Sequence, residues 1–201
     1  GVNLSRQTLA NWVLLATERH LVPLYNHLHR RLLDQEVLHA DETTVQVLQE
    51  LGRAAETKSY MWLYRTGRDG PPIVLFDYRP TRAGKHPIEF LSGFSGYLQV
   101  DGYAGYESIP NVTLVGCWAH ARRGFDEALK ALPASARSEG TTASEVGLAY
   151  CNRLFEIERS LKDLEPDARK AARQSKSLPV LNEFRAWLES QAEVMLPKSA
   201  F

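Results

Sequence analysis

Apolar residues recur every third or fourth position in the first part of the chain. Between Ser5 and Leu33 this spacing is typical of a helix, and the side chain of Ser5 is suited to cap its first turn. Pro23 lies within the stretch and has no backbone N–H, so we expect it to kink the helix or to start a second one. Residues 1–34 are therefore predicted to form a helical linker, and such a helix more often packs on protein than contacts DNA.

Short apolar runs replace the helical spacing in the middle of the chain. Two runs, 60–64 and 73–76, flank the pair Asp69-Gly70, which is typical of a hairpin turn. The other runs cover residues 37–40, 97–100 and 112–115. Because these runs are apolar on both faces, they favour strands inside a sheet that is covered by helices. Residues 35–134 are thus predicted to form an α/β domain with a mixed sheet of about five strands.

The helical spacing returns after about Ala119. Apolar residues recur every third or fourth position from Val146 to Leu164, and Pro179 is suited to the first turn of a further helix. We therefore expect residues 135–201 to form a separate helical lobe.

Composition places the chain among ordinary globular proteins. It has 201 residues, of which 44% are hydrophobic and 24% are charged, and this argues against disorder. No apolar stretch is long enough for a membrane span, and the first residues do not resemble a secretory signal. The two cysteines, Cys117 and Cys151, are too few for a disulfide framework, so a cytoplasmic location is expected.

Charge gives no overall attraction to nucleic acid. The 24 basic residues are balanced by 24 acidic ones, so any contact with DNA must come from local patches or from another part of the protein. One basic run includes Lys170 and Arg173. Such a run is usually a solvated face, and DNA contact is the alternative.

Two aspartates follow apolar runs at the point where the strands are expected to end. Asp41 follows residues 37–40, and Asp101 follows residues 97–100. Two carboxylates on adjacent strands would repel each other unless a cation lay between them, and oxygen ligands suit Mg²⁺ or Mn²⁺. Two such ions about 4 Å apart support phosphoryl transfer. The alternative is that Asp101-Gly102 simply forms a turn, and spacing alone leaves both possibilities open.

Three motifs around these residues point to a known family. They are His39-Ala40-Asp41-Glu42-Thr43, Val100-Asp101-Gly102-Tyr103-Ala104-Gly105-Tyr106 and Gly116-Cys117-Trp118-Ala119-His120-Ala121-Arg122-Arg123. In this order they resemble the central region of transposases of the IS66 insertion-sequence family, and shorter matches follow at 154–158 and 196–199. The resemblance implies a DDE-type catalytic core with a ribonuclease-H-like fold, followed by a helical insertion. It also implies that the protein acts on DNA, both element ends and target, as a homo-oligomer on the bacterial nucleoid, and not at a membrane.

The resemblance assigns roles to the acidic residues. Asp41 matches the first catalytic acid and Asp101 the second, and together they would hold Mg²⁺ or Mn²⁺. Glu42 should point to the opposite face of its strand, because side chains alternate, so we expect it to support the site without binding metal. His39 lies on the same face as Asp41, where it would either hydrogen-bond near that carboxylate or be a buried, satisfied histidine.

Further residues of the third motif match positions that support the core or contact DNA. Cys117 and His120 match a Cys-x-x-His signature, and because a zinc site needs four ligands we expect a supporting role instead of metal binding. Arg122 and Arg123 would contact DNA phosphates, although salt bridges to nearby acidic residues explain them equally well.

A third catalytic acid is not evident. In the family this glutamate belongs to an Asn-Asn-x-x-Glu-Arg motif, and no Asn-Asn pair occurs in the 201 residues. Glu156 and Glu158 are possible substitutes, but by the resemblance both belong to the insertion. The sequence therefore predicts a core truncated before its last helix, with two of its three catalytic acids.

The leading functional hypothesis is a DNA transposase core that cuts and joins DNA ends by two-metal phosphoryl transfer and is inactive as this fragment. The first alternative is a non-catalytic remnant that binds DNA or a partner. The second is a structure-specific nuclease with the same fold, which would cleave DNA without joining it.

Overall fold

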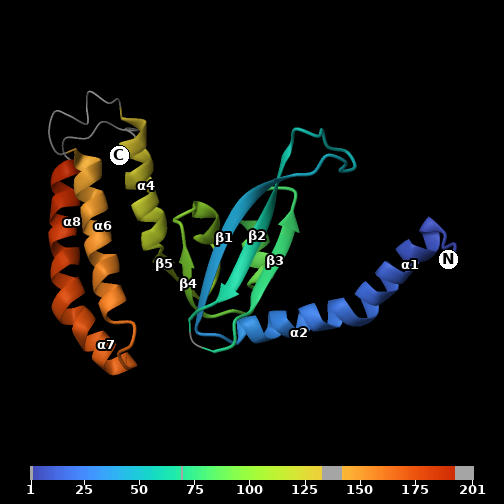
Figure 1. Cartoon of the computed structure of the whole chain (residues 1–201), viewed down its shortest axis with the longest axis horizontal. Helices are drawn as coiled ribbons and strands as arrows, with labels where there is room; N and C mark the ends of the chain where they lie inside the picture. The colour runs from blue at the N-terminus through green and yellow to red at the C-terminus, as the bar shows by residue number, and fades with distance from the viewer. Residues whose placement is uncertain (1, 69, 133–141, 193–201) are drawn as a thin grey trace. The chain divides into compact units, whose positions relative to one another are not determined.

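The computed structural model describes residues 2–68, 70–132 and 142–192, and it divides the chain into two compact units (Figure 1). The first unit is Gly1–Cys117 and the second is Trp118–Phe201. The domain boundary predicted near residue 135 lies outside the described residues, as does the short match at 196–199.

The first unit is built on a five-stranded sheet with the order β3-β2-β1-β4-β5. Its strands are β1 (Val37–Gln46), β2 (Lys58–Thr66), β3 (Val74–Arg79), β4 (Gly96–Val100) and β5 (Val112–Gly116). The strand β2 pairs antiparallel with β1 and β3, whereas β4 pairs parallel with β1 and β5. The predicted α/β fold with a mixed five-stranded sheet is confirmed, and the expected hairpin joins β2 to β3.

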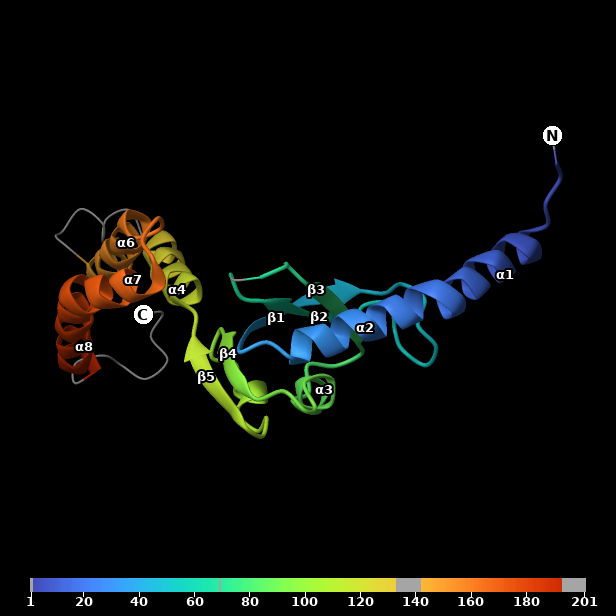
Figure 2. The same ribbon diagram turned by 90° about the horizontal axis from the view of Figure 1, so that it is seen from below.

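One face of this sheet forms the core of the first unit. Leu38 on β1 and Leu98 on β4 are side by side and fully buried. The helices α2 (Val22–Leu33) and α3 (Lys85–Phe90) lie along this face (Figure 2). The ring of Tyr64 on β2 stacks on the ring of Phe90 in α3, with 3.8 Å between their centroids. Regular alternation along the strands thus directs one set of side chains into this core.

A second α-helix starts next to Pro23, which is one of the two outcomes expected for this proline. The helical segment comprises α1 (Arg6–Ala16), a π-helical turn η1 (Thr17–Leu21) and α2, and the hydroxyl of Ser5 accepts a bond from the backbone N–H of Thr8 at 3.1 Å, as predicted. Pro23 is the second residue of α2, directly after the π-helical turn. The wider hydrogen-bond spacing of such a turn accommodates a residue without an N–H.

The second unit consists of helices. They are α4 (Trp118–Ala131), α6 (Ala143–Ser160), α7 (Pro166–Ala172), a π-helical turn η3 (Arg173–Ser177) and α8 (Leu178–Ala192). Pro179 again follows a π-helical turn as the second residue of a helix. The buried ring of Phe184 stacks on that of Tyr150, with 4.9 Å between centroids, and this aromatic contact joins α8 to α6. No helix within the described residues is long and apolar enough to cross a bilayer.

Substitutions at two neighbouring positions of β4 test which face of the sheet forms the core. Leu98 is fully buried, whereas Tyr97 is 54% exposed on the opposite face. We expect Leu98→Ala to lower the free energy of unfolding by about 2–5 kcal/mol, because it leaves a cavity in the core. Tyr97→Ala should lower it by less than about 1 kcal/mol. Urea denaturation measures both values, and equal losses would contradict the assignment.

Candidate active site

The two aspartates of the motifs lie just beyond the point where the pairing of β1 with β4 ends. The parallel pairing of β1 with β4 ends at His39 opposite Gln99, and each aspartate lies two residues further along the chain. Neighbouring strands are about 4.8 Å apart, so the two aspartates leave the last β1–β4 pair at equivalent positions of adjacent strands. The expectation that the strand before Asp101 lies beside the strand that contains Asp41 is confirmed.

The prediction that Asp41 ends its strand is wrong. β1 continues to Gln46 because it remains paired with β2, up to Gln46 opposite Lys58. Only the pairing with β4 stops before Asp41. At Asp41 the backbone of β1 is therefore paired with β2 but not with β4.

Asp101 directly follows β4 and begins a turn. Its Oδ1 accepts a hydrogen bond from the backbone N–H of Tyr103 at 2.9 Å, and Gly102 has a φ of +95°, which favours glycine. The possibility that Asp101-Gly102 forms a turn is therefore realised. The turn uses one carboxylate oxygen, and the side chain remains 23% exposed. A turn residue can still offer its second oxygen to a ligand.

Glu42 points away from Asp41, as alternation predicts. Its side chain is only 1% exposed and lies on the core face with Leu38 and Ala40. The guanidinium of Arg82 donates to Glu42 Oε1 from Nε at 2.7 Å, and the hydroxyl of Tyr106 donates to Oε2 at 2.5 Å. Burial and this hydrogen bond raise the pKa of Tyr106, so its hydroxyl stays protonated and remains a donor.

Sequence reasoning missed both partners of Glu42. Tyr106 is the last residue of the second motif and could have been found there, but its contact with Glu42 spans 64 positions of the chain. Arg82 belongs to no motif, and only the folded chain shows that it lies beside two acidic residues.

His39 is half-buried and lies two residues before Asp41 on the same strand. Burial lowers the pKa of its imidazole, and the positive charge of Arg65 on the neighbouring strand β2 lowers it further. A neutral ring is therefore favoured near pH 7. Its role beside Asp41 stays a prediction.

Cys117 and His120 fall in different units. Cys117 ends the first unit, where its backbone N–H donates to the carbonyl of Val100 at 2.9 Å, and His120 lies in the first turn of α4. Within the described residues, no three His, Cys, Asp or Glu side chains are arranged to hold a metal ion. The two aspartates provide oxygen donors that suit Mg²⁺ or Mn²⁺, but a complete site needs further ligands.

The arginines of the third motif lie on α4. Arg122 donates from Nε to the Asn152 side chain at 2.7 Å, while Lys130 binds Asp126 at 2.6 Å. Arg122 is thus held by an amide. The hydrogen bond from Lys130 has the largest effect in lowering the pKa of the Asp126 carboxyl, and the charge of Arg122 also lowers it. Arg123 is exposed. A contact between either arginine and DNA stays a prediction.

The basic run of the second unit is partly occupied by an ion pair. Arg173 binds both carboxylate oxygens of Glu158, at 2.8 and 2.7 Å, whereas Lys170 is exposed. Because both oxygens are bound, this is a bidentate pair, the strongest geometry that an arginine and a carboxylate form.

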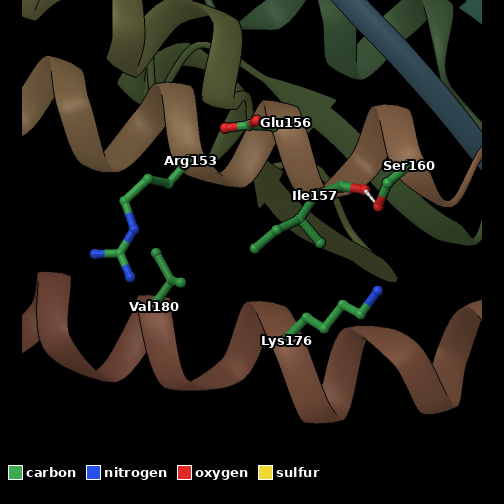
Figure 3. Close-up of a pocket in the computed structure, with 6 residues that line it drawn as sticks. All are labelled: Arg153, Glu156, Ile157, Ser160, Lys176 and Val180. Carbon is green, nitrogen blue, oxygen red and sulfur yellow. Dashed lines mark hydrogen bonds between the residues drawn. The ribbon is translucent and has the colours of Figure 1, made fainter.

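Glu156 lines a groove of about 530 Å³ between α6 and the helical segment of η3 and α8 (Figure 3). The groove is lined by Arg153, Glu156, Ile157, Ser160, Lys176 and Val180. Arg153 also pairs with Glu183 at 3.0 Å. The charges that surround Glu156 are therefore mixed, and Glu158 is bound by Arg173, so neither glutamate shows the clustered acidic setting of a metal ligand.

The fold and the site define an α/β protein with a mixed five-stranded sheet and two aspartates, one on its first strand and one directly after its fourth. The sequence matches the family described as "Transposase IS66 family" over residues 1–201. The chain belongs to this family, and the resemblance found in the motifs is confirmed.

Two curated relatives come from Sinorhizobium fredii (strain NBRC 101917 / NGR234), and both are uncharacterised. The protein y4hP is 34% identical over 218 residues, which cover 100% of this chain and 38% of y4hP. The protein y4qI is 30% identical over 211 residues, which cover 96% of this chain and 37% of y4qI. The chain thus spans less than two fifths of the length of these relatives.

Among solved structures, the chain is similar to part of a cryoEM structure of the simian T-cell lymphotropic virus intasome in complex with PP2A regulatory subunit B56 gamma. The sequence identity is 12% and the TM-score is 0.32, with 70% of this chain and 48% of the other covered. This likeness is too low to support an argument.

Proposed function

We propose that the chain carries part of the catalytic core of a DNA transposase, which cuts the ends of a mobile element and joins them to target DNA. The observation that carries the proposal is the placement of Asp41 and Asp101, each two residues beyond the last β1–β4 pair, in a chain of a transposase family. In this proposal the two carboxylates hold Mg²⁺ or Mn²⁺.

The surroundings of the two carboxylates support this role. Backbone N–H groups fix one oxygen of each: Glu42 donates to Asp41 Oδ1 and Tyr103 to Asp101 Oδ1, both at 2.9 Å. Such bonds orient the carboxylates before a ligand arrives, which reduces the cost of binding. A bound ion would supply Lewis-acid activation of an attacking oxygen and stabilisation of a leaving oxygen.

A third carboxylate is needed to complete such a site. We propose that it comes from an Asn-Asn-x-x-Glu-Arg segment outside these 201 residues, which contain no Asn-Asn pair. The relatives, which are more than twice as long as the matched region, leave room for this segment. Glu158 is a poor substitute because Arg173 already neutralises it.

Metal titration tests the role of the two aspartates. We expect weak Mn²⁺ binding to the chain, and a further weakening of about tenfold or more in Asp41→Ala and in Asp101→Ala, because each change removes a ligand. Asp126→Ala is a matched control, since this aspartate pairs with Lys130 on α4. Electron paramagnetic resonance of free Mn²⁺ measures binding. Equal affinity in all four proteins would remove both aspartates from the metal role.

Strand joining tests the proposed activity. The 201-residue chain should fold but should neither nick nor join DNA with element ends, because loss of one positioned catalytic group commonly costs orders of magnitude in rate. A longer gene product that contains the Asn-Asn-x-x-Glu-Arg segment should join strands with Mn²⁺. Cleavage without joining would favour a nuclease, and inactivity of both would favour a non-catalytic module. Joining by the short chain, lost in Asp101→Ala, would show that an acid within it completes the site.

We further propose that a second copy of the chain packs on α1. No residue of this helix is buried, and Leu9, Trp12, Val13, Leu14 and Leu15 are between 43% and 66% exposed. No charged residue occurs between Arg6 and Glu18. Leu9, Trp12, Val13 and Ala16 recur at the spacing of one helix face, and an antiparallel pair of α1 helices would bury them.

Light scattering tests this association. We expect the wild-type chain to dimerise and Val13→Glu to shift it towards the monomer, because the change places a charge in the apolar centre. Asn11→Glu, which places the same charge on the opposite side of the helix, should leave the dimer intact. A monomeric wild type, or equal dissociation of both variants, would contradict the proposal.

A further inference from the structure

Glu42 is a buried carboxylate that the proposed metal site does not use. Its side chain is 1% exposed, yet it lies next to Asp41 in the sequence and on the opposite face of β1. A carboxylate at such depth is retained only where hydrogen bonds and an opposite charge compensate its lost hydration. Arg82 and Tyr106 provide this compensation.

Arg82 lies between two carboxylates and binds the buried one. Its Nη2 is 2.5 Å from Glu42 Oε1 and 3.8 Å from Asp101 Oδ2. The first distance is a charge-assisted hydrogen bond, and the second is too long for one. The pKa of the Arg82 guanidinium is raised. Burial alone would lower it, but the hydrogen bond to Glu42 and the negative charge of Glu42 together have the larger effect.

The position of Arg82 is fixed by the turn that contains Asp101. Its guanidinium lies over the ring of Tyr103, 3.9 Å from the centroid, and the hydroxyl of Tyr103 donates to the carbonyl of Arg82 at 2.5 Å. The two loops also touch, because a Cβ added to Gly84 would lie 2.7 Å from the carbonyl oxygen of Gly105. Arg82 therefore cannot move far from Asp101 when its partner changes.

Without the charge of Glu42, Asp101 would be the closest carboxylate left to Arg82. A shift of about 1 Å closes the gap from 3.8 Å to a charge-assisted hydrogen bond. Oδ1 of Asp101 is already bound by the N–H of Tyr103. Arg82 would then occupy Oδ2, which is the oxygen that remains for a metal ion.

We propose that Glu42 is a positioning residue that holds Arg82 away from Asp101 and so keeps Asp101 Oδ2 accessible to the metal ion. The inference rests on the proposed function, because it concerns the same metal site. It gives the acidic pair Asp41-Glu42 two separate tasks on opposite faces of one strand: Asp41 binds the ion, and Glu42 neutralises the arginine that would compete with it.

Mn²⁺ affinity in a pair of variants separates this role from a structural one. Glu42→Gln keeps the shape and removes the charge, and it should weaken Mn²⁺ binding about tenfold. Adding Arg82→Gln removes the competitor, and affinity should return to within about threefold of the wild type. Tyr106→Phe is the matched control, because it removes a hydrogen bond from Glu42 but no charge, and it should change affinity by less than about twofold. Wild-type affinity in Glu42→Gln, or no recovery in the double variant, would overturn the proposal.

If the wild-type chain binds no Mn²⁺, a measurement without metal tests whether Arg82 contacts Asp101 once the charge of Glu42 is removed. The cycle comprises Glu42→Gln, Glu42→Gln/Arg82→Gln, Glu42→Gln/Asp101→Asn and the triple variant, none of which leaves a buried charge without its partner. Urea unfolding should show that Arg82 and Asp101 stabilise each other, with a coupling of about five- to tenfold in the unfolding equilibrium constant. Coupling below about twofold would refute the displaced contact.

The two measurements distinguish failure of the inference from failure of the proposed function. If Asp41→Ala and Asp101→Ala bind Mn²⁺ as tightly as the wild type, the metal site is wrong, while the unfolding cycle still decides whether Arg82 moves to Asp101. If both aspartates are needed for Mn²⁺ binding but Glu42→Gln binds normally, only the inference is wrong.

Discussion

The central strand β1 is the constraint on which the rest of the structure depends. It pairs antiparallel with β2 along its whole length, but its parallel pairing with β4 ends at His39 opposite Gln99. The strand is therefore rigid where it carries Asp41, yet it is open on the side where Asp101 leaves β4. A strand paired equally on both sides would continue the ladder there, and a strand paired on neither side would not hold a carboxylate in place.

The two-residue period of β1 gives its adjacent acids opposite surroundings. Asp41 lies on the face away from the core, whereas Glu42 is enclosed with Trp62 and Tyr106 around it. A buried charge needs a partner, and Arg82 satisfies this need from the loop after β3. Placing Arg82 there also brings a positive charge beside Asp101. The positive charge of Arg82 near Asp101 is therefore held there by Glu42, which faces the core and not the proposed metal site.

Much of the fold could be predicted from the sequence because its signals are local. The apolar runs locate all five strands, and Ser5 marks the start of the first helix. The end of β1 was misplaced because its last residues are polar and form a strand only through pairing with β2. Pro23 and Pro179 each lie in the first turn of a helix, as expected, but no residue pattern indicates the π-helical turn that precedes each helix. Arg82 was missed because its partner Glu42 is 40 positions away.

Several arginines of the helical unit form ion pairs with acidic residues nearby. The pairs are Arg173 with Glu158, Arg153 with Glu183 and Arg185 with Glu189. These three pairs are exposed, so salt screens them more than it would screen a buried pair. Arg82 differs, because its partner is buried and cannot be replaced by a phosphate without leaving a charge uncompensated. The ion pair of Arg82 thus joins the loop after β3 to a buried residue of β1, whereas the three arginines of the helical unit pair only on its surface.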